Sequence, residues 1–255
     1  MFNWIKNLLS NRTIQVAVEN ILSTVMKINN GVIQGSGIST ILFDMIMSTI
    51  PPAYLIDPVT SDEFADDVAY IVTKETLLEA MGAMQGAIDR FYNWSKTKGL
   101  TISTGKTKAM CFTSRHDNTP TLTLNNEEIE VVNQFKYLGM TFDAPLLTWK
   151  EHINKISEDY YQGINIMKAI SNAKWGANRG SLMQFYTAFI KSRIAYGSAA
   201  LLSACKTNLE KLEVIQNAAL RLATGASRMT YIPALQCEAN IPPIDLQMKL
   251  LGIKE

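Results

Sequence analysis

Two adjacent aspartates, Asp66 and Asp67, lie inside a run of residues that otherwise favours a β-strand. Aspartate is depleted in strands, and the neighbouring Phe64, Val68 and Tyr70 are apolar or aromatic. Two neighbouring carboxylates repel each other and lose hydration in such surroundings, and a bound cation is the usual compensation. Mg²⁺ suits this role, because it prefers carboxylate oxygens and keeps open positions for phosphate. A solvated turn that carries two aspartates is the open alternative.

The segment from Gly31 to Gly37 is a glycine-rich turn before a helix that is expected to begin near Ser39. Glycines permit tight turns, and backbone N–H groups at the start of a helix can approach a phosphate or a base. No lysine follows the glycines, so the segment is not a Walker phosphate-binding loop. A flexible connection between a hairpin and a helix is the simpler alternative.

Two stretches of the chain carry basic residues and no acidic ones, the first from Lys96 to Arg115 and the second from Lys168 to Lys206. The second stretch interleaves its cations with aromatic residues, which is typical of surfaces that track a nucleic-acid backbone. Its candidate backbone contacts are Lys168, Lys174, Arg179, Lys191 and Arg193, and its aromatic residues include Trp175, Phe185, Tyr186 and Tyr196. The alternative is that these aromatic residues are core and that the lysines are merely solvated.

The composition is that of a folded protein, with 47% hydrophobic and 18% charged residues among 255. A net charge of +1 provides no global field for a nucleic acid or a membrane, so such a partner would require a local patch. The three cysteines include no Cys-x-x-Cys pair and indicate neither a disulfide framework nor a zinc site. No segment has the pattern of a signal peptide or a membrane span, and we expect a soluble, intracellular protein.

The first 145 residues predict a mixed α+β domain. Alternating residues over 13–28 indicate a hairpin, and apolar positions over 39–49 indicate a short buried helix. Residues 61–72 predict two strands around the aspartate pair, packed on a helix that runs from about residue 73 to 94. Shorter strands are expected over 100–103, 108–113, 121–124 and 135–142.

Beyond Pro145 the pattern becomes entirely helical. Amphipathic stripes over 153–167, 182–189 and 209–222 indicate three helices. We therefore predict a domain boundary at Pro145, between an α+β domain of residues 1–145 and a helical domain of residues 146–255.

The order of these features resembles the palm of a reverse transcriptase, in particular that of non-LTR retrotransposons of the Jockey and I-element type, over nearly the whole chain. Gly31-Val32-Ile33-Gln34-Gly35-Ser36 resembles the family's nucleotide-pocket motif, and Phe64-Ala65-Asp66-Asp67 resembles its metal-binding turn. Leu100 to Lys108 resembles the strand and lysine motif that follows, and Phe135-Lys136-Tyr137-Leu138-Gly139 matches the primer-grip hairpin.

This resemblance implies an RNA-directed DNA polymerase, a nucleotidyltransferase, with a partial polymerase palm followed by an all-helical thumb and connection. Asp66 and Asp67 would help to hold two Mg²⁺ ions, and Lys106 would be the candidate proton donor near the pyrophosphate. Gln34, Gly35, Phe64 and Ala65 would line the nucleotide, whereas Phe135, Lys136, Tyr137, Leu138 and Gly139 would seat the primer end. The implied partners are an RNA template, a DNA primer and deoxynucleoside triphosphates, without a membrane.

The sequence departs from the family pattern at its start. The family's third metal carboxylate lies on a strand that precedes a motif similar to Leu8-Leu9-Ser10-Asn11-Arg12, and here that motif begins the chain. We therefore expect the strand with that aspartate, the fingers, the endonuclease and any RNase H domain to be missing, and the chain to be inactive on its own. Two alternatives stay open: a non-catalytic remnant that binds primer and template, and a helical interaction module that binds no nucleic acid.

Overall fold

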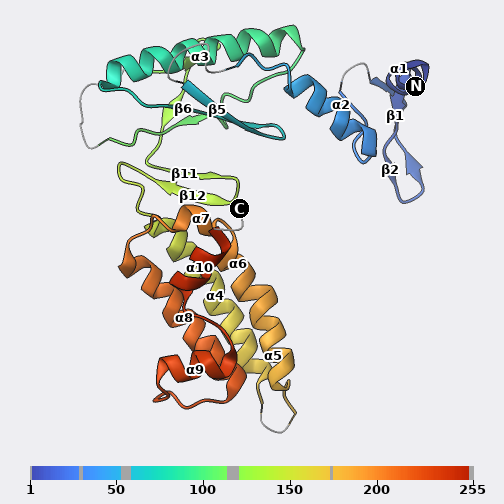
Figure 1. Cartoon of the computed structure of the whole chain (residues 1–255). Helices are drawn as coiled ribbons and strands as arrows, with labels where there is room; N and C mark the ends of the chain where they lie inside the picture. Colours follow the sequence, from blue (N-terminus) through green and yellow to red (C-terminus); the bar gives the residue numbers. More distant parts are fainter. Residues whose placement is uncertain (1, 29–30, 53–58, 114–120, 173–174, 253–255) are drawn as a thin grey trace. The chain divides into compact units, whose positions relative to one another are not determined.

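A computed structural model describes residues 2–28, 31–52, 59–113, 121–172 and 175–252. The chain combines helices with small, mostly antiparallel sheets, which confirms the predicted α+β class (Figure 1). It divides into two compact units, Met1–Lys106 with Asn118–Ile129 and Thr107–Asp117 with Glu130–Glu255. The domain boundary predicted at Pro145 stays a prediction. Among the described helices, none is both long and apolar enough to cross a membrane.

The first unit begins with helix α1 (Phe2–Leu9) and a long hairpin. Strand β1 (Arg12–Ile14) pairs antiparallel with β4 (Met26–Ile28), and β2 (Ala17–Val18) pairs with β3 (Ile21–Leu22), as the alternation over 13–28 predicts. Helix α2 (Gly37–Met47) follows the glycine-rich turn. The prediction that this helix is buried is wrong, because Ile41 and Met45 are 58% and 63% exposed. Periodicity identifies an apolar face but does not say whether another element covers it.

A second hairpin and a long helix form the centre of the first unit. Strands β5 (Val59–Phe64) and β6 (Asp67–Val72) are antiparallel over their whole length, which confirms the predicted pairing. Helix α3 (Leu77–Thr97) packs on this hairpin, and the Tyr70 and Phe91 rings meet edge to face with their centroids 5.8 Å apart. The Thr76 side chain caps the helix by accepting from the backbone N–H of Glu79, three residues later than the predicted start.

The chain leaves α3 in a way that removes one predicted strand. Gly99 adopts a φ of +69°, and the backbone N–H of Leu100 then donates to the carbonyl of Ser95 at 2.9 Å. This closure is typical of a helix C-terminus. Residues 100–103 therefore form no strand. A short hairpin of β8 (Thr123–Leu124) and β9 (Glu127–Glu128) completes the unit.

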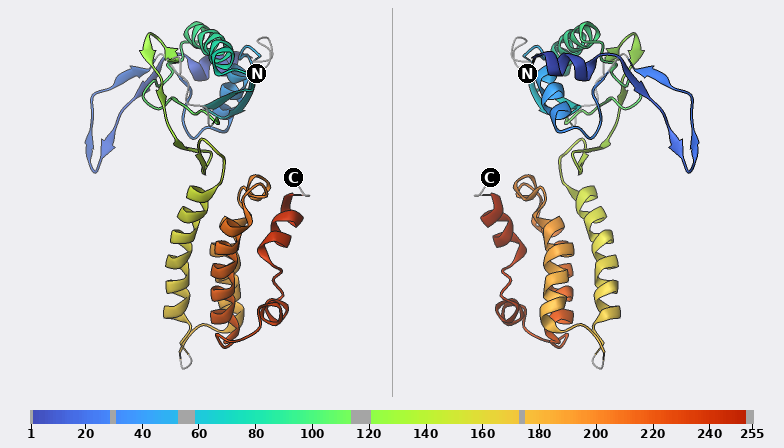
Figure 2. Two further views of the ribbon diagram at one scale, coloured as in Figure 1. Left: turned by 90° about the vertical axis from the view of Figure 1, so that its left-hand side faces the viewer. Right: turned by 90° about the vertical axis from the view of Figure 1, so that its right-hand side faces the viewer.

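The second unit contains two pairs of strands and a helical bundle. Strand β7 (Lys108–Ala109) runs parallel to β10 (Glu130–Val131), and β11 (Gln134–Tyr137) forms a hairpin with β12 (Met140–Asp143). The bundle consists of α4 (Lys150–Ile170), α5 (Arg179–Phe185), the π-helical turn Tyr186–Lys191, α6 (Ser192–Ala195), α7 (Ser198–Leu201), α8 (Lys206–Thr224), α9 (Ile232–Ala239) and α10 (Ile244–Gly252). Helices α4 and α8 lie side by side along their length (Figure 2).

The core of the second unit confirms the three predicted helices. The stripe of α4 is buried at Ile153, Ile156, Tyr160, Ile164 and Met167. Three polar groups inside the bundle are joined by hydrogen bonds, since the Tyr186 hydroxyl donates to Gln216 at 2.8 Å and Gln247 donates to the same Gln216 oxygen at 2.7 Å. Such a network ties α8, α10 and the π-helical turn into one arrangement.

Candidate active site

The aspartate pair lies at the turn of the β5–β6 hairpin. Phe64 pairs with Asp67 across the strands, so that Ala65 and Asp66 form a two-residue turn, as the sequence predicts. Ala65 has a φ of +54°, a left-handed conformation that costs a residue with a Cβ about 1–2 kcal/mol. The hairpin thus presents both carboxylates from a tight and strained turn.

The surroundings of the pair differ from those inferred from the sequence. Asp66 and Asp67 are both exposed, as is Phe64, so the inference that burial makes the pair costly is wrong. Neither carboxylate makes a hydrogen bond or ion pair with the described part of the chain, so both are open to an external cation. Their oxygens are the donors that Mg²⁺ prefers. However, no group of three His, Cys, Asp or Glu side chains suitable for a metal occurs among the described residues.

The nucleotide-pocket residues lie on the turn before α2. Gly35 has a φ of +86°, which favours glycine at this position, and Gln34 is exposed beside it. Lys106, the candidate proton donor, is exposed on the turn that precedes β7. These side chains are accessible to a ligand, and their assembly around one nucleotide stays a prediction.

The predicted primer-grip residues form the β11–β12 hairpin of the second unit. Leu138 and Gly139 make its two-residue turn, with φ angles of +44° and +79°. Positive φ at both turn residues matches the twist of a hairpin, but it is unfavourable for leucine. Lys136 is exposed on β11, directly opposite the buried Thr141.

A buried histidine, which the sequence analysis did not single out, lies against this hairpin. The Nδ1 atom of His152 accepts a hydrogen bond from the backbone N–H of Thr141 at 3.3 Å, whereas its buried Nε2 atom has no hydrogen-bond partner in the described part of the chain. Burial lowers the pKa of His152, and the charges of Lys155 and Lys136 lower it further. Lys155 of α4 and Lys136 of β11 therefore place two positive charges near His152.

Residues of the second acid-free stretch, Lys168 to Lys206, contact acidic side chains from other parts of the fold. Arg179 forms an ion pair with Glu238 of α9, and Arg193 lies 3.4 Å from Asp159 of α4 and over the Phe189 ring. Of the remaining candidates, Lys168 is exposed and Lys191 is half-buried, while Lys174 lies outside the described residues. Tyr186 is a fully buried core residue, as the alternative interpretation holds for aromatic residues at helical spacing.

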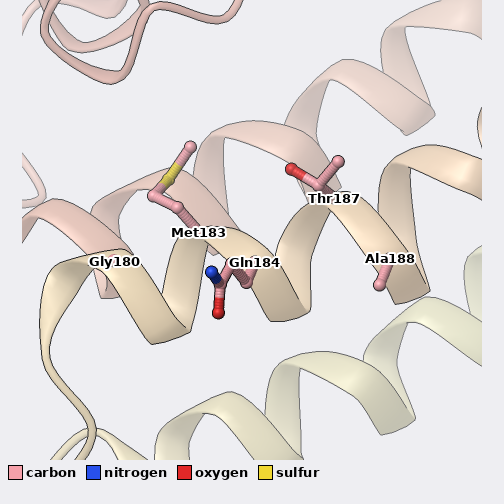
Figure 3. Close-up of a pocket in the computed structure, with 5 residues that line it drawn as sticks. All are labelled: Gly180, Met183, Gln184, Thr187 and Ala188. Atoms are coloured by element: carbon pink, nitrogen blue, oxygen red, sulfur yellow. The ribbon is translucent and has the colours of Figure 1, made fainter.

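A shallow groove runs along α5 and the π-helical turn, between Arg179 and Lys191 in the sequence. Its lining consists of Gly180, Met183, Gln184, Thr187 and Ala188 (Figure 3). No titratable side chain lines this groove, so it offers contact area without catalytic chemistry.

Comparison with known proteins identifies relatives for almost the whole chain. Residues 1–142 match the family model of the reverse transcriptase (RNA-dependent DNA polymerase). The chain is 25% identical over 249 residues to the RNA-directed DNA polymerase from mobile element jockey of Drosophila funebris, which covers 96% of this chain and 27% of that protein. The jockey polymerase of Drosophila melanogaster is 26% identical over 255 residues, covering 98% of this chain and 28% of that protein.

A third relative is the probable RNA-directed DNA polymerase from transposon BS of Drosophila melanogaster, at 25% identity over 251 residues, 96% of this chain and 28% of that protein. The chain thus spans little more than a quarter of the length of these relatives. No solved structure matches the chain.

Proposed function

Because the chain belongs to the reverse transcriptase (RNA-dependent DNA polymerase) family, we propose that it is the part of an RNA-directed DNA polymerase that carries the metal-binding turn, the primer grip and the thumb. One observation carries this proposal: Asp66 and Asp67 lie, exposed and unpaired within the described chain, at the turn of an antiparallel hairpin. An exposed carboxylate pair that makes no contact of its own is available to a ligand that carries positive charge.

Asp66 and Asp67 are the residues that would hold Mg²⁺. The bound ions would supply the charge that lowers the pKa of the primer 3′-hydroxyl and neutralises the triphosphate. Around this turn, Gln34, Gly35, Phe64 and Ala65 would line the incoming nucleotide, and Lys106 would deliver a proton to the leaving pyrophosphate. The small side chain of Ala65 leaves room beside the sugar.

The second unit would hold the nucleic acid. The β11–β12 hairpin would seat the primer end through Phe135 to Gly139, and the helices of residues 146–255 would form the thumb across a duplex of RNA template and DNA primer. Lys136 and Lys155 support this role, because both are exposed lysines that flank the same buried histidine. Deoxynucleoside triphosphates would be the second substrate.

These 255 residues would not extend a primer by themselves. Two carboxylates leave a pair of Mg²⁺ ions short of ligands, and the described residues contain no group of three potential metal ligands. The same observation supports a second candidate function, a non-catalytic module that binds primer and template. The two candidates differ in whether extension appears once the remaining part of a polymerase is supplied.

A primer-extension assay tests the proposal. The chain alone should give no extension, whereas its fusion to the upstream palm and fingers of the jockey polymerase should extend a DNA primer on an RNA template. Asp66→Asn in the fusion should lower the rate by about 10²-fold or more, because a charge-stabilising ligand is lost.

Asp62→Asn is the matched control, because Asp62 is an exposed aspartate of the same hairpin and lies outside its turn. Extension by the chain alone would contradict the incomplete site. Equal effects of Asp66→Asn and Asp62→Asn on the extension rate would contradict the assignment of the Asp66–Asp67 turn as the metal-binding turn.

A further inference from the structure

The tip of the β11–β12 hairpin interlocks with the junction between α6 and α7. The hydroxyl of Tyr196, the first residue after α6, donates a hydrogen bond to the backbone carbonyl of Leu138 in the hairpin turn. Both segments belong to the second unit. The bond joins residues 58 positions apart in sequence.

Two glycines make this close approach possible. A Cβ on Gly139 would lie 3.1 Å from Cε1 of the Tyr196 ring, and a Cβ on Gly197 would lie 2.4 Å from Sδ of Met140. The absence of a side chain at Gly139 makes room for Tyr196, and the absence of one at Gly197 makes room for Met140. Both glycines also have positive φ, at +79° and +69°, which a residue with a Cβ rarely adopts.

The hairpin tip needs this support, because Leu138 is held at a φ of +44° without the conformational freedom of glycine or the side-chain hydrogen bonds of asparagine. The hydrogen bond from Tyr196 falls on the carbonyl of this same strained residue. A free tip of this sequence would relax toward other turn conformations, and the exposed Lys136 would change its direction with the tip.

We propose that Tyr196 is a positioning residue that fixes the hairpin tip to the helical bundle, so that the tip and the bundle move as one body. The functional part of this proposal rests on the proposed role of the hairpin in seating the primer end. A movement of the helical domain then carries the primer end with it, and the rigid tip keeps Lys136 at a constant distance from Lys155 of α4.

Tyr196→Phe in the complete 255-residue chain tests the proposal, because it removes the hydroxyl and keeps the ring against Gly139. Hydrogen exchange of the backbone amides is measured in residues 134–143 and in α8. Loss of one hydrogen bond should accelerate exchange in the hairpin by about two- to tenfold, and exchange in α8 should stay unchanged. Tyr161→Phe is the matched control, because Tyr161 is an exposed tyrosine of α4 in the same unit.

A second measurement separates the positioning role from the function of the hairpin. A DNA primer with a photoreactive 3′-terminal nucleotide, annealed to an RNA template, is crosslinked to the chain. Crosslinks to residues 134–140 that become weaker and more dispersed in Tyr196→Phe support both proposals. If exchange is faster in Tyr196→Phe but the unmodified chain gives no such crosslinks, the positioning role of Tyr196 stands and the primer-grip role of the hairpin is overturned. Unchanged exchange in the hairpin, or equally faster exchange in α8, overturns the positioning role.

Discussion

The carboxylate of Asp143 holds Trp149 in a left-handed backbone conformation at the start of helix α4. Its Oδ1 atom accepts hydrogen bonds from the backbone N–H groups of Thr148 and Trp149, at 2.9 and 3.0 Å, and its Oδ2 atom accepts from the Thr148 hydroxyl. Trp149 has a φ of +59°, and its indole N–H donates to Ser203 at 2.8 Å. The last residue of β12 thus determines how the chain enters the helical bundle.

Replacing this carboxylate should destabilise the second unit. Asp143→Ala leaves two buried or half-buried N–H groups without a partner, and we expect a loss of about 1–3 kcal/mol in the free energy of unfolding. Urea denaturation of the complete chain measures this loss. Asp245→Ala is the control, because Asp245 lies in the first turn of α10, makes an exposed pair with Lys249 at 3.9 Å, and should cost at most about 1 kcal/mol. Equal losses in the two variants would contradict the capping role of Asp143.

The stability of the second unit should fall in mild acid because of His152. Burial lowers its pKa in the folded chain, so between the unfolded pKa of about 6.5 and the lower folded pKa the unfolded chain binds the additional proton. Stability is therefore lost as the pH falls through this range, by at most about 1.4 kcal/mol per pH unit. Above about pH 7 both states are neutral, and His152 contributes no pH dependence.

His152→Asn tests this dependence, because the asparagine oxygen can accept the Thr141 N–H in place of Nδ1 and does not titrate. The free energy of unfolding is measured at pH 7.5 and pH 5.5 for both chains. The difference between the two pH values should be smaller in the variant. An identical pH dependence in both chains would show that His152 is not the titrating group.

The sequence predicts elements well where the information is local. The stripe from Ile153 to Met167 determines a buried helix face, and the apolar residues beside Asp66 and Asp67 determine two strands with a turn between them. Contacts between distant segments leave no such pattern. Nothing in the spacing of the chain indicates that Asp159 reaches Arg193 or that His152 accepts from Thr141, because these contacts depend on how α4 packs.

Local patterns also mislead where a competing interaction wins. The residues after Gly99 favour a strand, but the backbone N–H of Leu100 bonds to Ser95 at the helix terminus, and residues 100–103 form no strand. The aspartate pair illustrates the same limit, since strand residues beside it suggest burial and the turn exposes it instead. The burial argument therefore does not support the site, and the assignment of Asp66 and Asp67 stays a prediction from the resemblance to a polymerase.

The strained turn at Ala65 predicts an order of stability for three residues. Glycine should stabilise the β5–β6 hairpin relative to alanine by up to about 1–2 kcal/mol, because it adopts the φ of +54° freely, and valine should destabilise it further, because positive φ is least favourable for a β-branched residue. Amide exchange in β6 measures the effect. Ala69→Val is the control, because Ala69 lies within β6, where a β-branched residue is favourable. A valine at position 65 that leaves exchange unchanged would contradict the strain.

The ion pairs of the acid-free stretch predict which of its cations bind a nucleic-acid backbone. Lys168 is exposed and Lys191 is half-buried, and neither makes an ion pair within the described residues, whereas Arg179 already carries Glu238 as its partner. For B-form DNA, each phosphate that the protein neutralises makes the slope of log binding constant against log salt concentration steeper by about 0.9. An RNA–DNA hybrid should behave comparably. Binding to an RNA–DNA hybrid is measured over a series of salt concentrations. The double variant Lys168→Gln with Lys191→Gln should flatten the slope, and Arg179→Gln should change it less.

No binding at low salt would leave the helical interaction module as the better description. A larger effect of Arg179→Gln would show that its ion pair opens for the ligand.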